Sequence, residues 1–227
     1  MVTCKVCNSK NVEELVFKQD VFRCKDCFLL FRTQKVDLAK YFEVDYWYKE
    51  DELLKLYQRS IFEWFKDYIV QGNTIEFGGA DGDFIALLRK VIDKKFTVVF
   101  NEIIPMLRAE YTNQNIKQAI YAFEDYTPKI KFSNIFFINT IEHLNDPITS
   151  LKKTRRMLAN NGRVFILTDD GDSVNAHNEM FYHWEHTFLF SHESLWVACQ
   201  KTGFKILKYF KSPQKMIYVI LEKVTEH

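Results

Sequence analysis

Strand-like and helical segments alternate along most of the chain, and this alternation restricts the fold more than any other feature. Runs rich in β-branched and aromatic residues occur at 74–78, 96–102, 116–122, 134–140 and 162–168. Helical patterns lie between them at 82–93, 104–113 and 147–159. Because strands that alternate with helices pair in parallel and are covered on both faces, the pattern predicts an α/β fold with a parallel sheet.

The C-terminal part departs from this alternation. A helix that opens at Ser191 is followed by two strand-like runs, "FKILKYF" and "KMIYVILEK", which are joined by "KSPQ". So short a connection requires a hairpin, since parallel strands need a longer crossover. The sequence therefore predicts seven strands, mostly parallel, with an antiparallel last strand. A helix with one buried face is expected before the first of them, in "DELLKLYQRSIFEWFKDYI".

Four of the five cysteines form two pairs near the N-terminus, Cys4-x-x-Cys7 and Cys24-x-x-Cys27. Each pair presents two thiolates to one ion, and two pairs complete a tetrahedron. Because four thiolates leave no position open for water, we expect a structural zinc ion in a small ribbon, with "LVFKQDVFRC" as a hairpin. Free thiols or a redox pair are the alternative. The remaining thiol, Cys199, is expected to pack in the core.

Composition and charge narrow the class of protein. Lys and Arg number 31 and Asp and Glu number 30, a formal charge of +1, so no overall positive field draws the chain to nucleic acid. The start lacks the apolar core of a signal peptide, and no stretch reaches the roughly 20 apolar residues of a membrane span. We therefore expect a cytoplasmic protein with a zinc ribbon (1–35), an aromatic and helical connection and lid (36–70) and a large α/β domain (71–227).

The stretch "IEFGGADGDF" at 75–84 ends a strand and opens a helix, where parallel sheets bind ligands. A dinucleotide loop reads G-x-G-x-x-G, whereas Gly78, Ala80 and Gly82 are spaced two and two. Asp81 and Asp83 would bond the first amides of the helix and repel a phosphate. The loop thus favours a ligand without phosphate that carries a positive amine and a sulfonium.

An acid at Glu76 followed by G-x-[GA]-x-G resembles the first motif of class I S-adenosylmethionine-dependent methyltransferases. "FFINTIEHLNDPITSLKKTRRMLANNGRVFIL" and "HWEHTFLFSHESLWVACQKTGFKIL" resemble a bacterial branch with a Glu-His-Leu motif, which is similar to sugar methyltransferases with a paired-cysteine zinc segment. The resemblance covers about residues 70 to 221 and implies a Rossmann-like fold. Ala80 replaces the central glycine, and Thr140 stands where those enzymes carry a tyrosine.

The resemblance also implies which residues bind S-adenosylmethionine. Glu102 ends the second strand and could accept both ribose hydroxyls, although a surface acid is the alternative for this position. One of Phe123, Glu124 and Asp125 is expected to meet the adenine, with Glu124 as our choice. The cofactor-binding residues predicted in this way are Glu76, Gly78, Gly79, Ala80, Gly82, Glu102, Glu124 and Asn139.

Methyl transfer also requires a base that removes a proton from the acceptor. His143, just past the fourth strand, is the predicted base, and Glu142 would orient it or bind an acceptor hydroxyl. Alternatively, both residues only cap the chain where it leaves the strand.

Two aromatic segments raise the choice between acceptor binding and packing. His183 and His186, in "HWEHTF", are predicted to contact the acceptor. Their His-x-x-His spacing lacks the flanking acid pattern of a metal site, so a metal site is the less favoured alternative. Tyr46 belongs to an aromatic cluster that forms either a lid over the acceptor or cover for the sheet. For Phe188 and Phe190 packing is the expectation.

Together these features predict methyl transfer from S-adenosylmethionine to oxygen or carbon of a small polar acceptor, with a nucleotide-linked or surface-polysaccharide sugar as the preferred class. An RNA-modifying methyltransferase that holds RNA with its zinc ribbon is one alternative, which the near-zero charge disfavours. A non-catalytic binding or scaffold protein with the same fold is the other.

Overall fold

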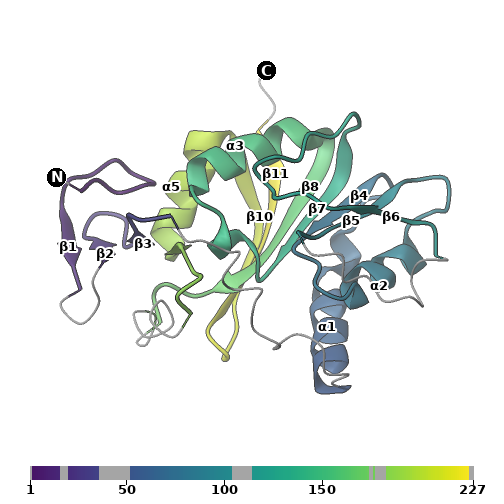
Figure 1. Ribbon diagram of the computed structural model, residues 1–227, viewed down its shortest axis with the longest axis horizontal. Helices are drawn as coiled ribbons and strands as arrows, with labels where there is room; N and C mark the ends of the chain where they lie inside the picture. Colours follow the sequence, from purple (N-terminus) through teal and green to yellow (C-terminus); the bar gives the residue numbers. More distant parts are fainter. Residues whose placement is uncertain are drawn as a thin grey trace. The chain divides into compact units, whose positions relative to one another are not determined.

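The computed structural model describes residues 2–15, 20–35, 52–103, 114–173, 176 and 183–224 (Figure 1). The chain forms two compact units. Unit 1 comprises Met1–Glu43, Asn139–Arg156 and Ile166–His227, and unit 2 comprises Val44–Ile138 and Met157–Phe165. Tyr46 and the helix expected at 104–113 lie outside the described residues. Within the described part, none of the helices combines the length and the apolarity that crossing a bilayer requires.

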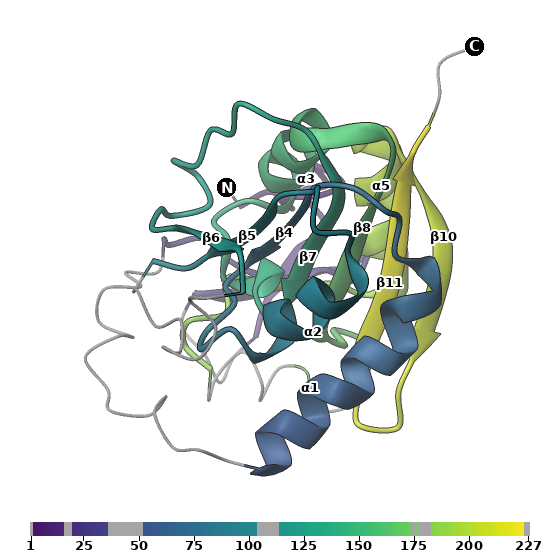
Figure 2. The ribbon, with the colours of Figure 1, turned by 90° about the vertical axis from the view of Figure 1, so that its right-hand side faces the viewer.

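The larger sheet has seven strands in the order β10-β11-β8-β7-β4-β5-β6. Their bounds are β4 Thr74–Phe77, β5 Val98–Asn101, β6 Ile116–Ala119, β7 Phe132–Ile138, β8 Leu158–Asp169, β10 Phe204–Lys211 and β11 Met216–Lys223. β4 pairs in parallel with β5 and β7, and β5 pairs in parallel with β6. β10 and β11 form an antiparallel hairpin (Figure 2). The predicted α/β fold with seven strands and an antiparallel end is confirmed.

Unit 2 is built on a core of phenylalanine rings. Phe136 of β7 stacks on Phe165 of β8, with ring centroids 4.3 Å apart and planes 10° apart. Phe65, at the end of α1 (Glu52–Phe65), meets the Phe165 ring edge-on at 5.4 Å, and Phe84, at the start of α2 (Asp83–Val91), meets Phe136 at 5.3 Å. α1 packs against α2 (Figure 2). These contacts anchor the start of α2, and with it the glycine loop that precedes the helix.

Asn134 at the start of β7 joins two segments of unit 2. Its Nδ2 donates to the carbonyl oxygen of Val70 at 2.7 Å and to Oγ1 of Thr74 at 2.9 Å, while its Oδ1 accepts from the Val70 amide at 2.9 Å. The side chain is fully buried and uses both ends of its amide. Asn134 therefore ties the chain after α1, which passes through the short helix η3 (Lys66–Tyr68), to the sheet.

Unit 1 contains a second, four-stranded sheet. Its strands are β1 Val12–Glu14, β2 Val21–Cys24, β3 Leu30–Arg32 and β9 Phe188–Leu189, paired in that order and all antiparallel. β1 and β2 form an antiparallel hairpin in the cysteine-rich segment. β2 lies within the expected stretch 15–24, whereas β1 ends at Glu14, just before it. The sequence did not indicate β9, a strand too short to show an alternating pattern, whereas the burial expected of Phe188 and Phe190 is confirmed.

Among its described residues, unit 1 has the helices η5 Ile141–His143, α3 Pro147–Met157 and α5 His192–Thr202, of which Figure 1 labels α3 and α5. Ser191 opens α5 as predicted, since its Oγ accepts from the Ser194 amide at 2.9 Å and the Ser194 Oγ accepts from the Ser191 amide at 2.8 Å. Gly203 ends the helix with φ 71°. α3 ends two residues earlier than expected, because Leu158 is buried and begins β8.

Candidate functional site

The loop between β4 and α2 has a backbone that few side chains permit. Gly78 has φ 68°, Ala80 has φ 47° and Gly82 has φ 89°, all in the left-handed region. A Cβ at Gly79 would lie 2.6 Å from Cε2 of Phe100 and 3.1 Å from Oε2 of Glu76. The loop therefore needs small residues at successive positions for two reasons, backbone dihedral angles and the close approach of β5.

Glu102, directly after β5, holds this loop from the neighbouring strand. Its Oε2 accepts from the Ala80 amide at 3.1 Å, and its Oε1 accepts from the Ile103 amide at 2.7 Å. The side chain is 9% exposed. The sequence placed the glycine loop at the end of one strand and Glu102 at the end of the next. In the structure, Glu102 contacts the glycine loop.

Glu76 is the buried acid of the loop. Its side chain is 2% exposed, and its Oε2 has no hydrogen-bond partner among the described residues. Burial, with added repulsion from Asp81 and Glu102, raises the pKa of Glu76 well above its usual range. Oδ1 of Asp81 accepts from the amide of Asp83, the first residue of α2, at 3.3 Å, as expected, while Gly82 is the N-cap of the helix. A cationic or donor group of a ligand would satisfy this set of carboxylates.

Of the three residues considered for the adenine, Phe123 is a core residue. It is 5% exposed and meets the ring of Phe77 edge-on, with centroids 5.0 Å apart. Glu124 and Asp125 are exposed in the turn that follows β6. Asn139, in unit 1, directly follows β7 with φ 49°, and its amide donates to the carbonyl oxygen of Leu167 at 2.9 Å.

Three histidines of unit 1 lie together. The ring centroid of His186 is 4.9 Å from that of His143 and 4.9 Å from that of His183. The His186 amide donates to the carbonyl oxygen of His183 at 3.0 Å, which closes a turn and stacks the two rings with 18° between their planes. The structure therefore gathers the predicted base and both predicted acceptor-binding histidines into one cluster.

Two carboxylates that the sequence did not indicate surround these imidazoles. Oε1 of Glu185 lies 3.1 Å from Nδ1 of His183, and the backbone carbonyl oxygen of Glu185 lies 3.4 Å from Nδ1 of His143. Oδ2 of Asp169 lies 3.7 Å from Nδ1 of His186. The one sequence signal that could have indicated Glu185 is its position between the two histidines of "HWEH".

Burial holds several groups of this cluster in their uncharged forms. Burial lowers the pKa of His143, and burial, followed by the neighbouring His143 and His183, lowers the pKa of His186 to about 2. Burial, together with the carboxylate of Asp169, raises the pKa of Glu142 to about 8. At neutral pH the imidazoles of His143 and His186 are therefore proton acceptors, and the Glu142 carboxyl is mostly protonated.

The four paired cysteines of unit 1 also lie together, with their sulfur atoms all within 4.8 Å of one another. Sγ of Cys4 lies 3.5 Å from Sγ of Cys27, and Sγ of Cys7 lies 3.4 Å from Sγ of Cys24. Sulfurs bound to one zinc ion at about 2.3 Å would be about 3.8 Å apart in a tetrahedron. Four sulfur donors at this spacing suit a cation that prefers thiolate ligands. The predicted ligands fit a single metal ion.

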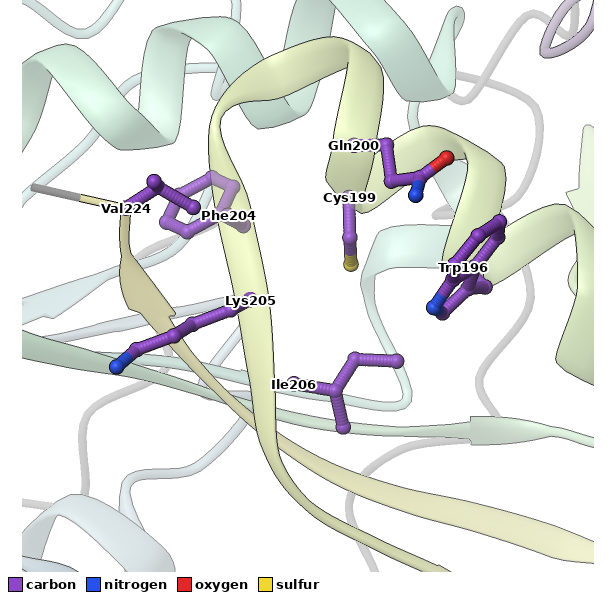
Figure 3. Close-up of a pocket in the computed structure, with 7 residues that line it drawn as sticks. All are labelled: Trp196, Cys199, Gln200, Phe204, Lys205, Ile206 and Val224. Carbon is purple, nitrogen blue, oxygen red and sulfur yellow. The ribbon is translucent and has the colours of Figure 1, made fainter. Parts of the chain in front are cut away.

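A pocket of about 510 Å³ lies elsewhere in unit 1, along α5 and β10 (Figure 3). Trp196, Cys199 and Ile206 point into it in Figure 3. None of the predicted site residues lines this pocket. Burial raises the pKa of the Cys199 thiol to about 12, which is typical of a packed cysteine.

Comparison with known proteins shows the family of the chain. Residues 46–209 match a family model described as a methyltransferase domain. None of the curated proteins compared with the chain matches it in sequence. Many solved structures resemble the fold.

Three of these structures have a TM-score of 0.62. A protein from Pyrococcus horikoshii OT3 is 14% identical, and the match covers 81% of this chain and 98% of that one. The N-methyltransferase NodS of Bradyrhizobium japonicum WM9, in complex with S-adenosyl-L-homocysteine, is 12% identical over 83% of this chain and 97% of that one. The mitomycin 7-O-methyltransferase MmcR is 12% identical, and the match covers 83% of this chain and 61% of that one. At these identities the likeness establishes the fold.

Proposed function

Because the chain belongs to the S-adenosylmethionine-dependent methyltransferases, we propose that it methylates an oxygen or carbon atom of a small polar acceptor. The preferred acceptor class is a nucleotide-linked or surface-polysaccharide sugar. Methyl transfer from a sulfonium is an in-line displacement, so the protein must align the acceptor with the methyl group and take up the acceptor's proton. These two tasks fall to different groups of residues.

The proposal assigns cofactor binding to the glycine loop and Glu102. Gly79 leaves no room for a side chain, and the loop presents acidic side chains rather than a bare helix N-terminus, which suits a ligand with an amine and a sulfonium. Oε2 of Glu76, which lacks a partner among the described residues, would accept from a donor of the ligand. Glu102 would exchange its backbone partners for the two ribose hydroxyls.

His143 is the proposed base, and its hydrogen bond is the observation that carries this assignment. A carbonyl oxygen only accepts, so with its proton on Nδ1 the His143 ring would donate to the Glu185 carbonyl oxygen. In the neutral ring the lone pair then resides on Nε2. Burial keeps the imidazole neutral, which is the state in which it can accept a proton from a hydroxyl or an activated carbon.

The acceptor side is assigned to the histidine cluster. His183 is half exposed, whereas His186 and Glu142 are buried, so polar groups extend from the surface into the cluster. The protonated carboxyl of Glu142 would donate a hydrogen bond, and the neutral imidazoles would accept from hydroxyl groups. A polyhydroxylated acceptor such as a sugar offers both kinds of partner. The resembling N- and O-methyltransferases support a small molecule, though not this particular class.

Zinc is the metal that we propose for the four cysteines. A Cys₄ set with no carboxylate or open position is typical of structural zinc, and when bound the ion would supply folding energy to strands too short to be stable alone. Cys4, Cys7, Cys24 and Cys27 would be its ligands. The expected composition is one zinc ion per chain, measured by elemental analysis of the purified protein.

The test begins with calorimetric titration of the protein with S-adenosylmethionine and S-adenosylhomocysteine. Transfer of a labelled methyl group is then measured to a panel of nucleotide sugars, with structured and single-stranded RNA as a further arm. His143→Gln should lower the rate of transfer by about 10²- to 10⁴-fold but keep cofactor affinity, whereas His192→Gln, at an exposed histidine at the start of α5, should change neither. Absence of cofactor binding would refute the proposal, and methylation of RNA alone would refute the small-molecule acceptor.

A further inference from the structure

The cysteine-rich ribbon and the histidine cluster share one small sheet. β3 of the ribbon pairs with β9, so that Leu30 faces Leu189 and Phe31 faces Phe188. All four side chains are buried. β9 begins two residues after His186, so the ribbon is the sheet neighbour of the segment that carries two of the three clustered histidines.

Arg32 continues this pairing to the histidine itself. Its amide donates to the carbonyl oxygen of Thr187 at 2.8 Å, and its Nε donates to the carbonyl oxygen of His186 at 3.1 Å. Both hydrogen-bond acceptors are backbone groups, so these two bonds restrain the path of the chain at His186. The positive charge of Arg32 also acts on the imidazole and, in addition to burial, helps to lower the pKa of His186. The buried His186 ring has little freedom once its backbone is held.

Hydrogen bonds from the other side complete the restraint. The Thr187 amide donates to the carbonyl oxygen of Glu142 at 2.8 Å, and the Thr187 hydroxyl contacts the carbonyl oxygens of Glu142 and Leu144. Residues 186 and 187 are therefore held between the ribbon and the segment of His143. The restrained backbone at residues 186 and 187 therefore connects the segment that carries His183 and His186 to the segment that carries His143.

The cysteine knuckles make the remaining contacts of the ribbon. Ser191 Oγ donates to the carbonyl oxygen of Cys27 at 2.7 Å, shortly after β9. Nζ of Lys5, between Cys4 and Cys7, donates to the carbonyl oxygen of Asn145 at 3.1 Å, shortly after His143. The conformation that a metal would impose on the knuckles is thus transmitted to the chain on both sides of the cluster.

We propose that the metal-binding ribbon positions the histidine cluster, with Arg32 as the positioning residue through which β3 sets the backbone of His186. The catalytic consequence rests on the proposed function, whereas the positioning itself does not. Metal occupancy would then control acceptor alignment and proton transfer without contact between the metal and either substrate. We refer to this support of the histidine segment by the ribbon, through Arg32, as the brace.

Arg32→Ala tests the brace against a matched control. Arg23→Ala removes the same charge from the neighbouring strand β2, where Arg23 donates to the carbonyl oxygen of Gly171 at 3.3 Å and not to the histidine segment. With ¹⁵N-labelled histidine, Arg32→Ala should shift the imidazole signals of His186 and His143, and so should Arg32→Lys, which keeps the charge that acts on His186, while Arg23→Ala should leave the signals unchanged. Both alanine variants should keep zinc and cofactor affinity. Equal imidazole shifts in the two variants, or none in either, would overturn the proposal.

Hydrogen exchange tests the role of the metal. In Cys7→Ser, the amides of residues 186–189 should lose protection together with those of β2 and β3, while β4, β5 and β7 keep theirs. Cys199→Ala, which alters a buried thiol outside the cluster, should keep protection at 186–189. Retained protection at 186–189 in the metal-free Cys7→Ser protein would overturn the proposal.

Turnover then separates this inference from the proposed function. With an acceptor identified, Arg32→Ala should lower kcat by roughly 10- to 100-fold with the Kd of the cofactor unchanged, because misplaced groups slow the chemical step. Arg32→Lys keeps the charge but not the guanidinium geometry and should recover little of the loss. Imidazole shifts without any turnover would refute the catalytic proposal alone, whereas normal kcat in Arg32→Ala would overturn the brace alone.

Discussion

The carbonyl oxygen of Glu185 lies 3.4 Å from Nδ1 of His143, although 42 positions separate the two residues in the chain. With its proton on Nδ1, the neutral imidazole would donate to this oxygen and keep its lone pair on Nε2. The same residue uses its side chain on Nδ1 of His183 at 3.1 Å. Glu185 thus orients two histidines with different atoms, and several expectations depend on this arrangement.

The first prediction concerns the pH dependence of methyl transfer. Burial lowers the pKa of His143 below its usual 6.5, so the neutral base should persist to lower pH than a free histidine would. The acid limb of kcat/KM should therefore lie below pH 6.5. His143→Gln should lower kcat by about 10²- to 10⁴-fold and remove that limb. A wild-type limb above pH 7 would contradict the assignment.

The second prediction concerns stability in acid. The pKa of His186 is about 2 in the folded chain and about 6.5 unfolded, so between these values the unfolded chain binds the extra proton. Stability should fall as pH falls below 6.5, by up to about 1.4 kcal/mol per pH unit from this one group. Urea unfolding between pH 6.5 and 4.5 should show a shallower decline in His186→Gln. Parallel declines in the two proteins would contradict the prediction.

The third prediction concerns Glu142 and has the opposite dependence on pH. Its pKa of about 8 exceeds the unfolded value of 4.5, so the folded chain binds the extra proton between pH 4.5 and 8. Stability from this group is complete below pH 4.5 and declines as pH rises through 8. Glu142→Gln should match the wild type at pH 4.5 and exceed it by about 1–3 kcal/mol at pH 8.5. A gain that does not vary with pH would point to packing instead.

The fourth prediction concerns the glycine loop. A methyl group at Gly79 would lie 2.6 Å from the ring of Phe100, so Gly79→Ala should destabilise unit 2 by about 1–3 kcal/mol and weaken cofactor binding. Ala80→Gly should instead be neutral or slightly stabilising, since it relieves φ 47° at a residue with a side chain. Thermal unfolding with and without S-adenosylhomocysteine compares the two. Equal tolerance of both changes would contradict the close approach.

The fifth prediction concerns Glu102. Glu102→Gln keeps one acceptor oxygen for the Ala80 amide but removes the charge and the second acceptor, so it should raise the Kd for S-adenosylmethionine at least about tenfold. Glu124→Gln, in the exposed turn after β6, tests whether that turn contributes, with a smaller expected effect. Calorimetric titration measures both. Unchanged affinity in Glu102→Gln would exclude the ribose contact.

Local chemistry in the sequence was sufficient for much of the fold and part of the site. Three short-range patterns predicted features that the structure confirms: the alternation of strands and helices, the cap at Ser191 and the two cysteine pairs. The ligand that the glycine spacing favours stays a prediction. Backbone dihedral preferences and helix capping act within a few residues, so they can be read without knowing what packs against them. The zinc ion, the ligand roles and the domain bounds remain predictions.

Tertiary contacts decided the rest. Arg32 and His186 are 154 positions apart, and nothing local to either marks their hydrogen bond. β9 has two residues and becomes a strand because the ribbon supplies its partner. The neutral states of His143 and His186 and the raised pKa of Glu142 follow from burial, which only the packed chain produces. The sequence by itself determined which groups can perform the chemistry, and the tertiary structure decided which of them meet and in which protonation state, because desolvation and long-range pairing arise only on folding.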